Sequence, residues 1–212
     1  MREYEAIADR IAADRPGRVL DWGCGYGQVT DLLLKRGVET SAFDYAPESD
    51  GPQRLDRYPH IEALLSSHPY ELPYPADEFD AVLSCGVLEH VEFPEASLAE
   101  LRRVLRTRGI LYVFKLPNKR SYLEWIARRG GLYYHGMYPH DRVYDLGGAE
   151  ALLRKAGFEV HEIRMANMLP LTLPGGAAWR LSSSIWALNR ALARMPVLNR
   201  LATNIEVVAA SP

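Results

Sequence analysis

Short apolar runs alternate along the chain with stretches in which apolar residues recur at helical spacing. Near the start, Tyr4, Ile7 and Ile11 have this spacing and predict a short leading helix that packs on a sheet or covers a ligand. Further helices are predicted at 28–36 and 146–156. Strands are predicted at 19–21, 40–44, 61–65, 81–85, 110–115, 158–164 and 205–209. This alternation is typical of an α/β protein with a parallel sheet.

The most informative segment is a glycine-rich turn between a predicted strand and a predicted helix. The strand ends in Asp21, and Gly23, Gly25 and Gly27 follow at alternate positions before the helix begins at Gln28. Such a turn leaves backbone amides free to face a ligand at the carboxyl end of the strand, as nucleotide-type pockets require. The spacing does not match the dinucleotide pattern Gly-x-Gly-x-x-Gly. Taken alone, the glycines are also compatible with a simple strand-to-helix turn.

A second carboxylate follows the next predicted strand. Asp44 ends the strand that begins at Thr40, and in a doubly wound sheet the second strand brings such an acid next to the glycine turn. There the two oxygens of Asp44 can accept hydrogen bonds from two adjacent ribose hydroxyls. Tyr45 comes directly after it and is assigned to the same pocket.

Three blocks of the chain carry a family resemblance. Asp21-x-Gly23-x-Gly25-x-Gly27 resembles motif I of the class I S-adenosylmethionine (SAM) dependent methyltransferases, and the chain is similar to their type 11, small-molecule members. Residues 78–91, which contain Leu-Glu-His-Val, and residues 98–114 resemble the fourth strand, connecting helix and fifth strand of that family. The resemblance implies one domain, 1–212, with a doubly wound, seven-stranded, mostly parallel sheet. It also implies an antiparallel last strand, and the chain carries an insertion before it.

The resemblance implies SAM as the cofactor. It assigns the cofactor contacts to Asp21, Gly23, Cys24, Gly25, Gly27, Asp44, Tyr45 and Cys85. After the third strand, relatives commonly have an acid that contacts the adenine amino group, whereas this chain has Ser66, Ser67 and His68. His68 is therefore the candidate adenine contact, with a solvated loop histidine as the alternative. Two prolines and a glycine at 46–57 predict that the usual helix there is short or absent.

Side chains on the acceptor side decide which nucleophile is methylated. For a hydroxyl acceptor a base must take the proton, and histidine is best matched to that task near neutral pH. Glu89 and His90 follow the fourth strand, where they either act as the base or shape the methionine pocket. His140, beside Asp141 in the aromatic-rich loop 116–145, is the favoured catalytic candidate, since an adjacent carboxylate fixes the tautomer of a histidine. The alternative is a turn that starts the next helix.

Composition and charge indicate which partners, metals and cellular location to expect. A net charge of −2 without a basic groove argues against nucleic acid as a partner. The two cysteines, Cys24 and Cys85, are expected to be packing thiols in a reducing compartment. The charged N-terminus lacks a signal-peptide pattern and no stretch is apolar enough to span a bilayer, so a cytoplasmic location is expected. No spacing of ligand residues matches a defined metal motif, so no metal is expected.

Residues 166–203 form an insertion before the last strand. The insertion contains four arginines and neither acid nor lysine. If 177–195 is helical, one apolar stripe lies roughly opposite most of these arginines, and it consists of Leu181, Ile185, Leu188, Leu192 and Met195. The stripe can pack within the protein as a lid, meet a second subunit in a homodimer, or contact a lipid surface. Packing within the protein is the favoured interpretation.

These features predict a SAM-dependent methyltransferase that methylates a hydroxyl group of a small or amphipathic acceptor, such as a glycan, a glycolipid or a phenolic ring. One rival is N- or C-methylation of a small metabolite, for which a histidine base is dispensable. The other is a SAM-binding regulatory subunit without an acceptor pocket.

Overall fold

The computed structural model describes residues 2–45, 57–66, 68, 70–131, 141–169, 184–185, 187–189 and 191–212. Residues 46–56, for which no regular helix was predicted, and 132–140, which include His140, lie outside them. Within the described residues the helices are α1 (Arg2–Ala13), α2 (Gln28–Leu34), α3 (Pro94–Val104), α4 (Tyr122–Arg129), α5 (Leu146–Lys155) and the 3-10 helix η2 (Leu198–Leu201). The strands are β1 (Arg18–Trp22), β2 (Glu39–Tyr45), β3 (Ala63–Ser66), β4 (Phe79–Cys85), β5 (Leu105–Pro117), β6 (Glu159–Ala166) and β7 (Asn204–Ala210).

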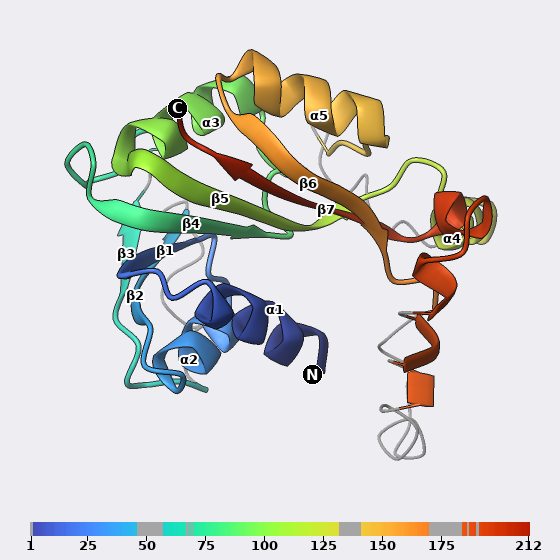
Figure 1. Cartoon of the computed structure of the whole chain (residues 1–212), viewed down its shortest axis with the longest axis horizontal. Helices are drawn as coiled ribbons and strands as arrows, with labels where there is room; N and C mark the ends of the chain where they lie inside the picture. The colour runs from blue at the N-terminus through green and yellow to red at the C-terminus, as the bar shows by residue number, and fades with distance from the viewer. Residues whose placement is uncertain are drawn as a thin grey trace.

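A single sheet in the order β3-β2-β1-β4-β5-β7-β6 runs through the centre of the described structure (Figure 1). Neighbouring strands from β3 to β5 are parallel, and β7 is antiparallel to both β5 and β6. The predicted seven-stranded sheet with an antiparallel last strand is therefore confirmed. The strand order reverses between β1 and β4, so the carboxyl ends of these strands border a crevice of the kind in which open α/β sheets bind ligands.

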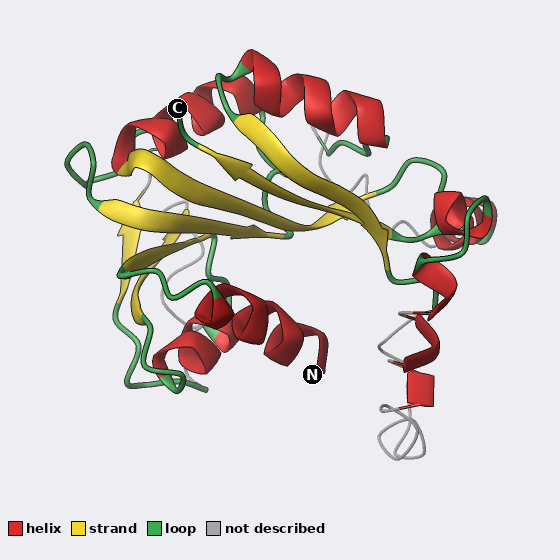
Figure 2. Cartoon of the chain, in the orientation of Figure 1, coloured by secondary structure: helices red, strands yellow, loops and turns green. Residues whose placement is uncertain are grey.

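Helices cover both faces of the sheet because its central strands are apolar on both faces. Helices α1 and α2 lie on one face, and α3 and α5 lie on the other (Figure 2). Along β4, Leu83 packs in the cluster that contains Ile7 and Ile11 of α1, whereas its neighbour Val82 packs in the cluster that contains Leu98 of α3. Alternate residues of one strand thus supply both cores, as expected of a doubly wound fold.

Strand β5 is longer than predicted and contains a β-bulge. Its register against β7 shifts between Val113 and Leu116, and Lys115 between them has a φ of 63°. Bulges redirect side chains, and the Nζ of Lys115 lies 3.5 Å from Oε2 of Glu3 and donates a hydrogen bond to the hydroxyl of Tyr4 at 3.2 Å. The bulge therefore ties the first turn of α1 to the carboxyl end of β5.

The insertion before β7 does not form one buried apolar stripe. Leu192 packs against the core, but Leu188 and Met195 are 49% and 46% exposed. Asn189 is buried instead, and its Oδ1 accepts hydrogen bonds from the backbone amides of residues 168 and 169. A polar side chain anchors the insertion, while part of the predicted stripe faces outward. Leu181 lies outside the described residues. Within them, the helical positions of the insertion are 184–185, 187–189 and 191–193.

In Figure 1 this orange-to-red segment extends away from the sheet. No helix in the described part of the chain is long and apolar enough to cross a membrane.

Truncation of a central core side chain should reveal how much the sheet depends on its two-sided packing. Leu83 is fully buried in β4, so Leu83→Ala should lower the free energy of unfolding by about 2–5 kcal/mol in urea denaturation. The matched control is Leu64→Ala on β3, where the side chain is partly exposed and the change should stay within about 0.5 kcal/mol. Equal losses for the two variants would contradict this account of the core.

Candidate active site

The turn after β1 is packed closely against its neighbours. Gly23, Gly25 and Gly27 have φ angles of 77°, 54° and 74°, a region that strains other residues. A Cβ atom on Gly23 would also lie 2.4 Å from Cγ2 of Val87. The turn that follows β4 therefore lies directly against the turn that follows β1, and the two form adjacent walls of one site.

The backbone amides of this turn are bonded to β2 instead of open to a ligand. Gly23 and Cys24 donate to the carbonyl of Phe43 at 2.8 and 2.9 Å, and Gly25 donates to Oδ2 of Asp44 at 2.9 Å. The expectation of open amides is wrong at these positions because the end of β2 lies alongside the turn and accepts their hydrogen bonds. The turn is consequently held in one conformation by the protein itself.

Asp44 remains well placed for the predicted ribose contact. Its Oδ1 accepts a hydrogen bond from the amide of Tyr45 at 2.8 Å, and its Oδ2 accepts the one from Gly25. A carboxylate offers about four acceptor positions, so these two bonds orient the group without excluding a diol. The contact itself stays a prediction.

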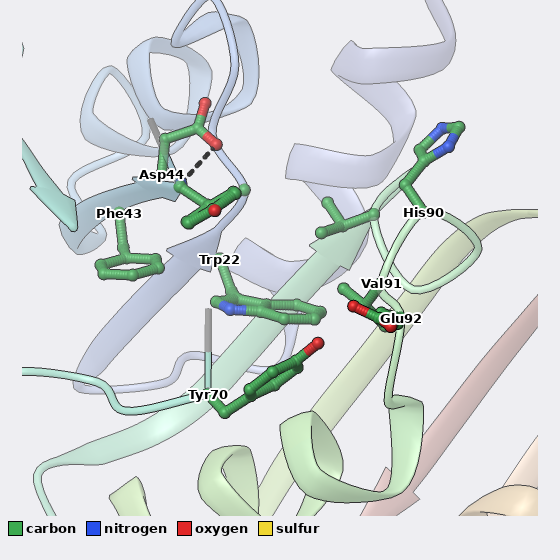
Figure 3. Close-up of a pocket in the computed structure, with 10 residues that line it drawn as sticks. Trp22, Phe43, Asp44, Tyr70, His90, Val91 and Glu92 are labelled. Carbon is green, nitrogen blue, oxygen red and sulfur yellow. Dashed lines mark hydrogen bonds between the residues drawn. The ribbon is translucent and has the colours of Figure 1, made fainter. Parts of the chain in front are cut away.

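A cavity of about 180 Å³ opens at the crevice between β1 and β4 (Figure 3). The rings of Trp22, Phe43 and Tyr70 give it flat apolar surfaces, which suit an aromatic ring. Gly23, Asp44 and Tyr45 border the same space, so three of the predicted cofactor residues meet here. The complete lining is Trp22, Gly23, Phe43, Asp44, Tyr45, Tyr70, Val87, His90, Val91 and Glu92.

Three other predicted cofactor side chains lie away from the lining of this cavity. Cys24 packs with Ala42 and Ile61, so a contact with the cofactor would have to come from its main chain. Cys85 ends β4, where burial raises the pKa of its thiol, and neither cysteine is in a disulfide. His68 is exposed on the loop after β3. Its adenine contact stays a prediction.

Asp21 points into the interior toward α2. Its carboxyl group is buried, and Oδ2 accepts a hydrogen bond from the hydroxyl of Thr30 at 2.6 Å. Burial raises the pKa of Asp21 to about 6, with the Thr30 hydrogen bond opposing the shift and the charge of Asp44 adding to it. In this position Asp21 fastens α2 to β1 and is absent from the cavity lining.

A histidine and a carboxylate that are 51 positions apart in the sequence meet beside the cavity. His90, which lines the cavity, has its Nδ1 at 2.9 Å from Oδ1 of Asp141. The Asp141 side chain is 2% exposed. The sequence indicated that Asp141 would orient the adjacent His140, which lies outside the described residues. In the structure the carboxylate orients His90.

Arg142 holds this arrangement in place. Its guanidinium donates hydrogen bonds to the carbonyls of Val91 and Glu92 at 2.6 and 2.9 Å. Its backbone amide donates to the carbonyl of Glu89 at 2.9 Å. These three bonds fasten the end of loop 116–145 to the turn after β4, which brings Asp141 beside the cavity.

Glu89 is a buried carboxyl group in the same turn. It is 3% exposed, and its Oε2 has no hydrogen-bond partner within the described residues. Burial raises the pKa of Glu89 to about 7, although the charges of His90 and Lys115 oppose this shift. Glutamate and histidine are common metal ligands, but no group of three ligand side chains in the described part of the chain is arranged to hold an ion.

Sequence reasoning missed the aromatic walls of the cavity. Trp22 could have been found, because it stands inside the glycine motif between Asp21 and Gly23. Tyr70 had no such signal. It reaches the cavity through the packing of the loop after β3, where the centroids of its ring and the Phe93 ring are 5.5 Å apart.

Comparison with known proteins gives independent information on this fold and site. Residues 1–163 match the family model described as a methyltransferase domain. The ubiquinone biosynthesis O-methyltransferase of Thiobacillus denitrificans is 30% identical over 165 residues, which cover 73% of this chain and 70% of the relative. A probable S-adenosylmethionine-dependent methyltransferase of Mycobacterium tuberculosis is 33% identical over 119 residues, which cover 56% of this chain and 42% of that relative. This chain therefore spans less than half the length of the second relative.

Among solved structures, the complex between the Haloferax volcanii Trm112 methyltransferase activator and a putative methyltransferase matches with a TM-score of 0.66. The match covers 100% of this chain and 91% of that one at 17% sequence identity. At this identity the likeness shows the fold alone.

The buried carboxyl of Asp21 should make stability depend on pH. Because its pKa in the folded protein is raised to about 6, the folded state holds a proton that the unfolded state releases above about pH 4. The stability of the wild type relative to Asp21→Asn should therefore fall as pH rises from 4 to 7, by about 3 kcal/mol. Urea denaturation at several pH values measures this difference.

Thr30→Val provides the matched comparison for Asp21. Removing the hydroxyl that donates to the carboxylate should raise the pKa of Asp21 in the folded state further, so the decline in stability should continue to higher pH. A difference between wild type and Asp21→Asn that stays constant from pH 4 to 7 would contradict the assignment.

Proposed function

The chain belongs to the class I SAM-dependent methyltransferases, and on that premise we propose that it methylates a hydroxyl oxygen of a small or amphipathic acceptor, with His90 as the proton acceptor. The observation that carries the proposal is the pairing of His90 with the buried carboxylate of Asp141 beside the cavity. The related O-methyltransferase of Thiobacillus denitrificans supports an oxygen acceptor.

The residues around the cavity fit the cofactor. The carboxylate of Asp44 is fixed at the rim, the rings of Trp22 and Tyr70 offer flat apolar faces, and close packing of Gly23 on Val87 brings the two turns together. When bound, SAM would supply a methyl group on a sulfonium cation, so that an oxygen in line with the C–S bond could take the methyl carbon while the sulfur leaves as a neutral thioether. The contribution of this chain is to hold the ligands in place, exclude water and accept a proton.

His90 is oriented for the last of these tasks. A carboxylate at 2.9 Å from Nδ1 favours the tautomer in which Nδ1 carries the proton, so that Nε2 is the nitrogen that accepts one. When the acceptor oxygen bonds to the methyl carbon, its proton would pass to Nε2 of His90. The buried Asp141 would then stabilise the imidazolium that forms. His140 is kept as a second candidate base.

The amphipathic acceptor is supported by the insertion. Its exposed apolar residues have no acidic neighbour in the sequence between 166 and 203, whereas four arginines occur there. We define the insertion surface as the exposed side chains of Leu188, Met195, Val197, Leu198 and Leu201. An apolar surface with basic residues and no acids fits an anionic lipid surface, from which the enzyme would take its acceptor. A homodimer contact remains the alternative.

The acceptor class can be determined by labelling. Purified protein is incubated with cell extract and SAM that carries a labelled methyl group, and the products are partitioned between organic solvent and water. Base-stable label in the organic phase supports an amphipathic or phenolic acceptor, and label on polar saccharides supports a small glycan. Label on an amine or carbon supports the rival reactions, and SAM binding without transfer supports the regulatory subunit.

Substitution in the histidine pair should reduce turnover. His90→Ala should lower kcat by about 10²–10⁴, and Asp141→Asn should lower it as well, because the amide no longer stabilises the imidazolium. The control is His161→Ala, an exposed histidine on β6, which should retain full kcat. Steady-state kinetics measures these values, and unchanged kcat in His90→Ala would argue for His140 as the base or for N- or C-methylation.

The insertion surface should bind anionic vesicles. Leu188→Asp and Leu198→Asp should abolish vesicle flotation while leaving the melting temperature nearly unchanged, because both side chains are exposed. Added salt should weaken flotation of the wild type, since screening reduces the attraction between arginines and headgroups. The control is Leu64→Asp on β3, also partly exposed, which should float normally. A wild type that does not float but forms dimers through this surface would contradict the proposal.

A further inference from the structure

We propose that the carboxyl group of Glu89 is the counter-charge for the methyl donor, so that the site holds a cationic donor more tightly than the neutral product left after transfer. The ligand class is a nucleoside with a positive charge at the position of the sulfonium. This role concerns donor binding and does not depend on the identity of the acceptor or the base.

The first support is the position of Glu89 within the fold. It lies in the turn after β4, at the carboxyl end of a central strand and next to the crevice where such sheets bind ligands. Val87 and His90, on either side of it in the sequence, both line the cavity. The Oε1 of Glu89 lies 3.9 Å from Nε2 of His90 and would lie 3.7 Å from a Cβ on Gly86. The carboxyl group therefore sits directly behind the cavity wall.

The second support is the incomplete bonding of this carboxyl group. Its Oε2 is buried and lacks a hydrogen-bond partner among the residues that the structure describes. A buried carboxylate oxygen without a hydrogen-bond partner costs free energy, and a group kept at such a cost fits a site that a ligand completes. A positively charged ligand is the partner that would lower this cost most.

The third support is that Lys115, a basic side chain near Glu89, is already engaged. Lys115 affects Glu89 electrostatically, but its ammonium is paired with Glu3 and donates to the hydroxyl of Tyr4 on α1. Asp44, which is fixed at the rim of the cavity, adds further negative charge. The carboxyl groups of Asp44 and Glu89 thus lie at one crevice, which favours a cationic ligand.

The ligand loses its positive charge during the reaction. Before transfer the donor carries a positive sulfonium, and after the methyl group leaves on the acceptor the sulfur is a neutral thioether. The attraction of Glu89 for the ligand is present before the step and absent after it. The product is then released more readily than the donor.

The experiment compares two ligands that differ in this charge. S-adenosylhomocysteine has a neutral thioether, whereas sinefungin has a protonated amine in place of the methylated sulfur. Calorimetric titration of the full chain gives both dissociation constants for the wild type and for Glu89→Gln. The control is Glu95→Gln, which removes an exposed carboxylate of α3 that pairs with Lys155 and so changes the net charge equally.

Glu89→Gln should weaken sinefungin binding by about tenfold or more, because two unit charges within about 10 Å of each other interact at least this strongly at an effective dielectric constant near 20. The same variant should change the affinity for S-adenosylhomocysteine less than about twofold. Glu95→Gln should leave both constants unchanged. Equal weakening of both ligands by Glu89→Gln, or no weakening of either, would overturn the proposal.

The wild type provides a second test that needs no variant. A cation bound beside a partly protonated carboxyl group drives off its proton, so sinefungin binding near pH 7 should release a fraction of a proton and S-adenosylhomocysteine binding should release none. Titrations in buffers of different ionisation enthalpy measure this release. The titratable groups around Glu89 are His90, Asp141, Lys115, Cys85 and Tyr144. Identical proton release with both ligands would contradict the proposal even if Glu89→Gln failed to fold.

Discussion

The geometry of the site depends on one steric constraint, which is that residue 23 has no Cβ. The methyl groups of Val87 occupy the space that a side chain there would need, so the turn after β4 packs directly on the turn after β1. Because of this contact, one wall of the cavity is formed by Val87, His90 and Val91. Trp22 and Phe43 line the same cavity from β1 and β2. Close packing of backbone on side chain thus converts the crevice of the sheet into a defined cavity.

Once the turn after β4 is in place, it becomes the anchor for a distant segment. Arg142 binds its carbonyls, and this brings the carboxylate of Asp141 to His90. The catalytic candidates therefore come from segments that share no local sequence pattern. Their relative position is set by hydrogen bonds to main-chain atoms, which are insensitive to the side chains of residues 91 and 92.

Two buried carboxyl groups lie at or just after the carboxyl ends of the central strands β1 and β4. Asp21 is satisfied by Thr30 and stabilises the joint between β1 and α2, whereas Glu89 has an oxygen without a partner within the described residues. Both carboxyl groups have raised pKa values because burial disfavours their charged forms. This difference in partners is the basis for proposing that Glu89, and not Asp21, faces the charge of a ligand. The two carboxyl groups look alike in sequence, since each stands at or just after the end of a strand.

The sequence by itself determined the order of the strands along the chain, the glycine turn and the position of Asp44. These features are local: apolar periodicity, turn chemistry and the end of a strand are all encoded within a few residues. They sufficed to predict a doubly wound sheet, and the resemblance of three motif blocks identified the family. Asp44 reached its expected place because parallel pairing of β1 with β2 follows from the fold class.

Tertiary structure alone decided which side chains meet. The pairing of Asp141 with His90, the burial of Asn189 instead of Leu188, and the arrival of Tyr70 at the cavity all depend on how loops pack on the sheet. Asp141 and His90 are 51 positions apart, so no local pattern in the sequence predicts their contact. The bonding state of the glycine-turn amides was likewise decided by the end of β2, because a hydrogen bond is satisfied by the nearest acceptor in space and not by the nearest one in the chain.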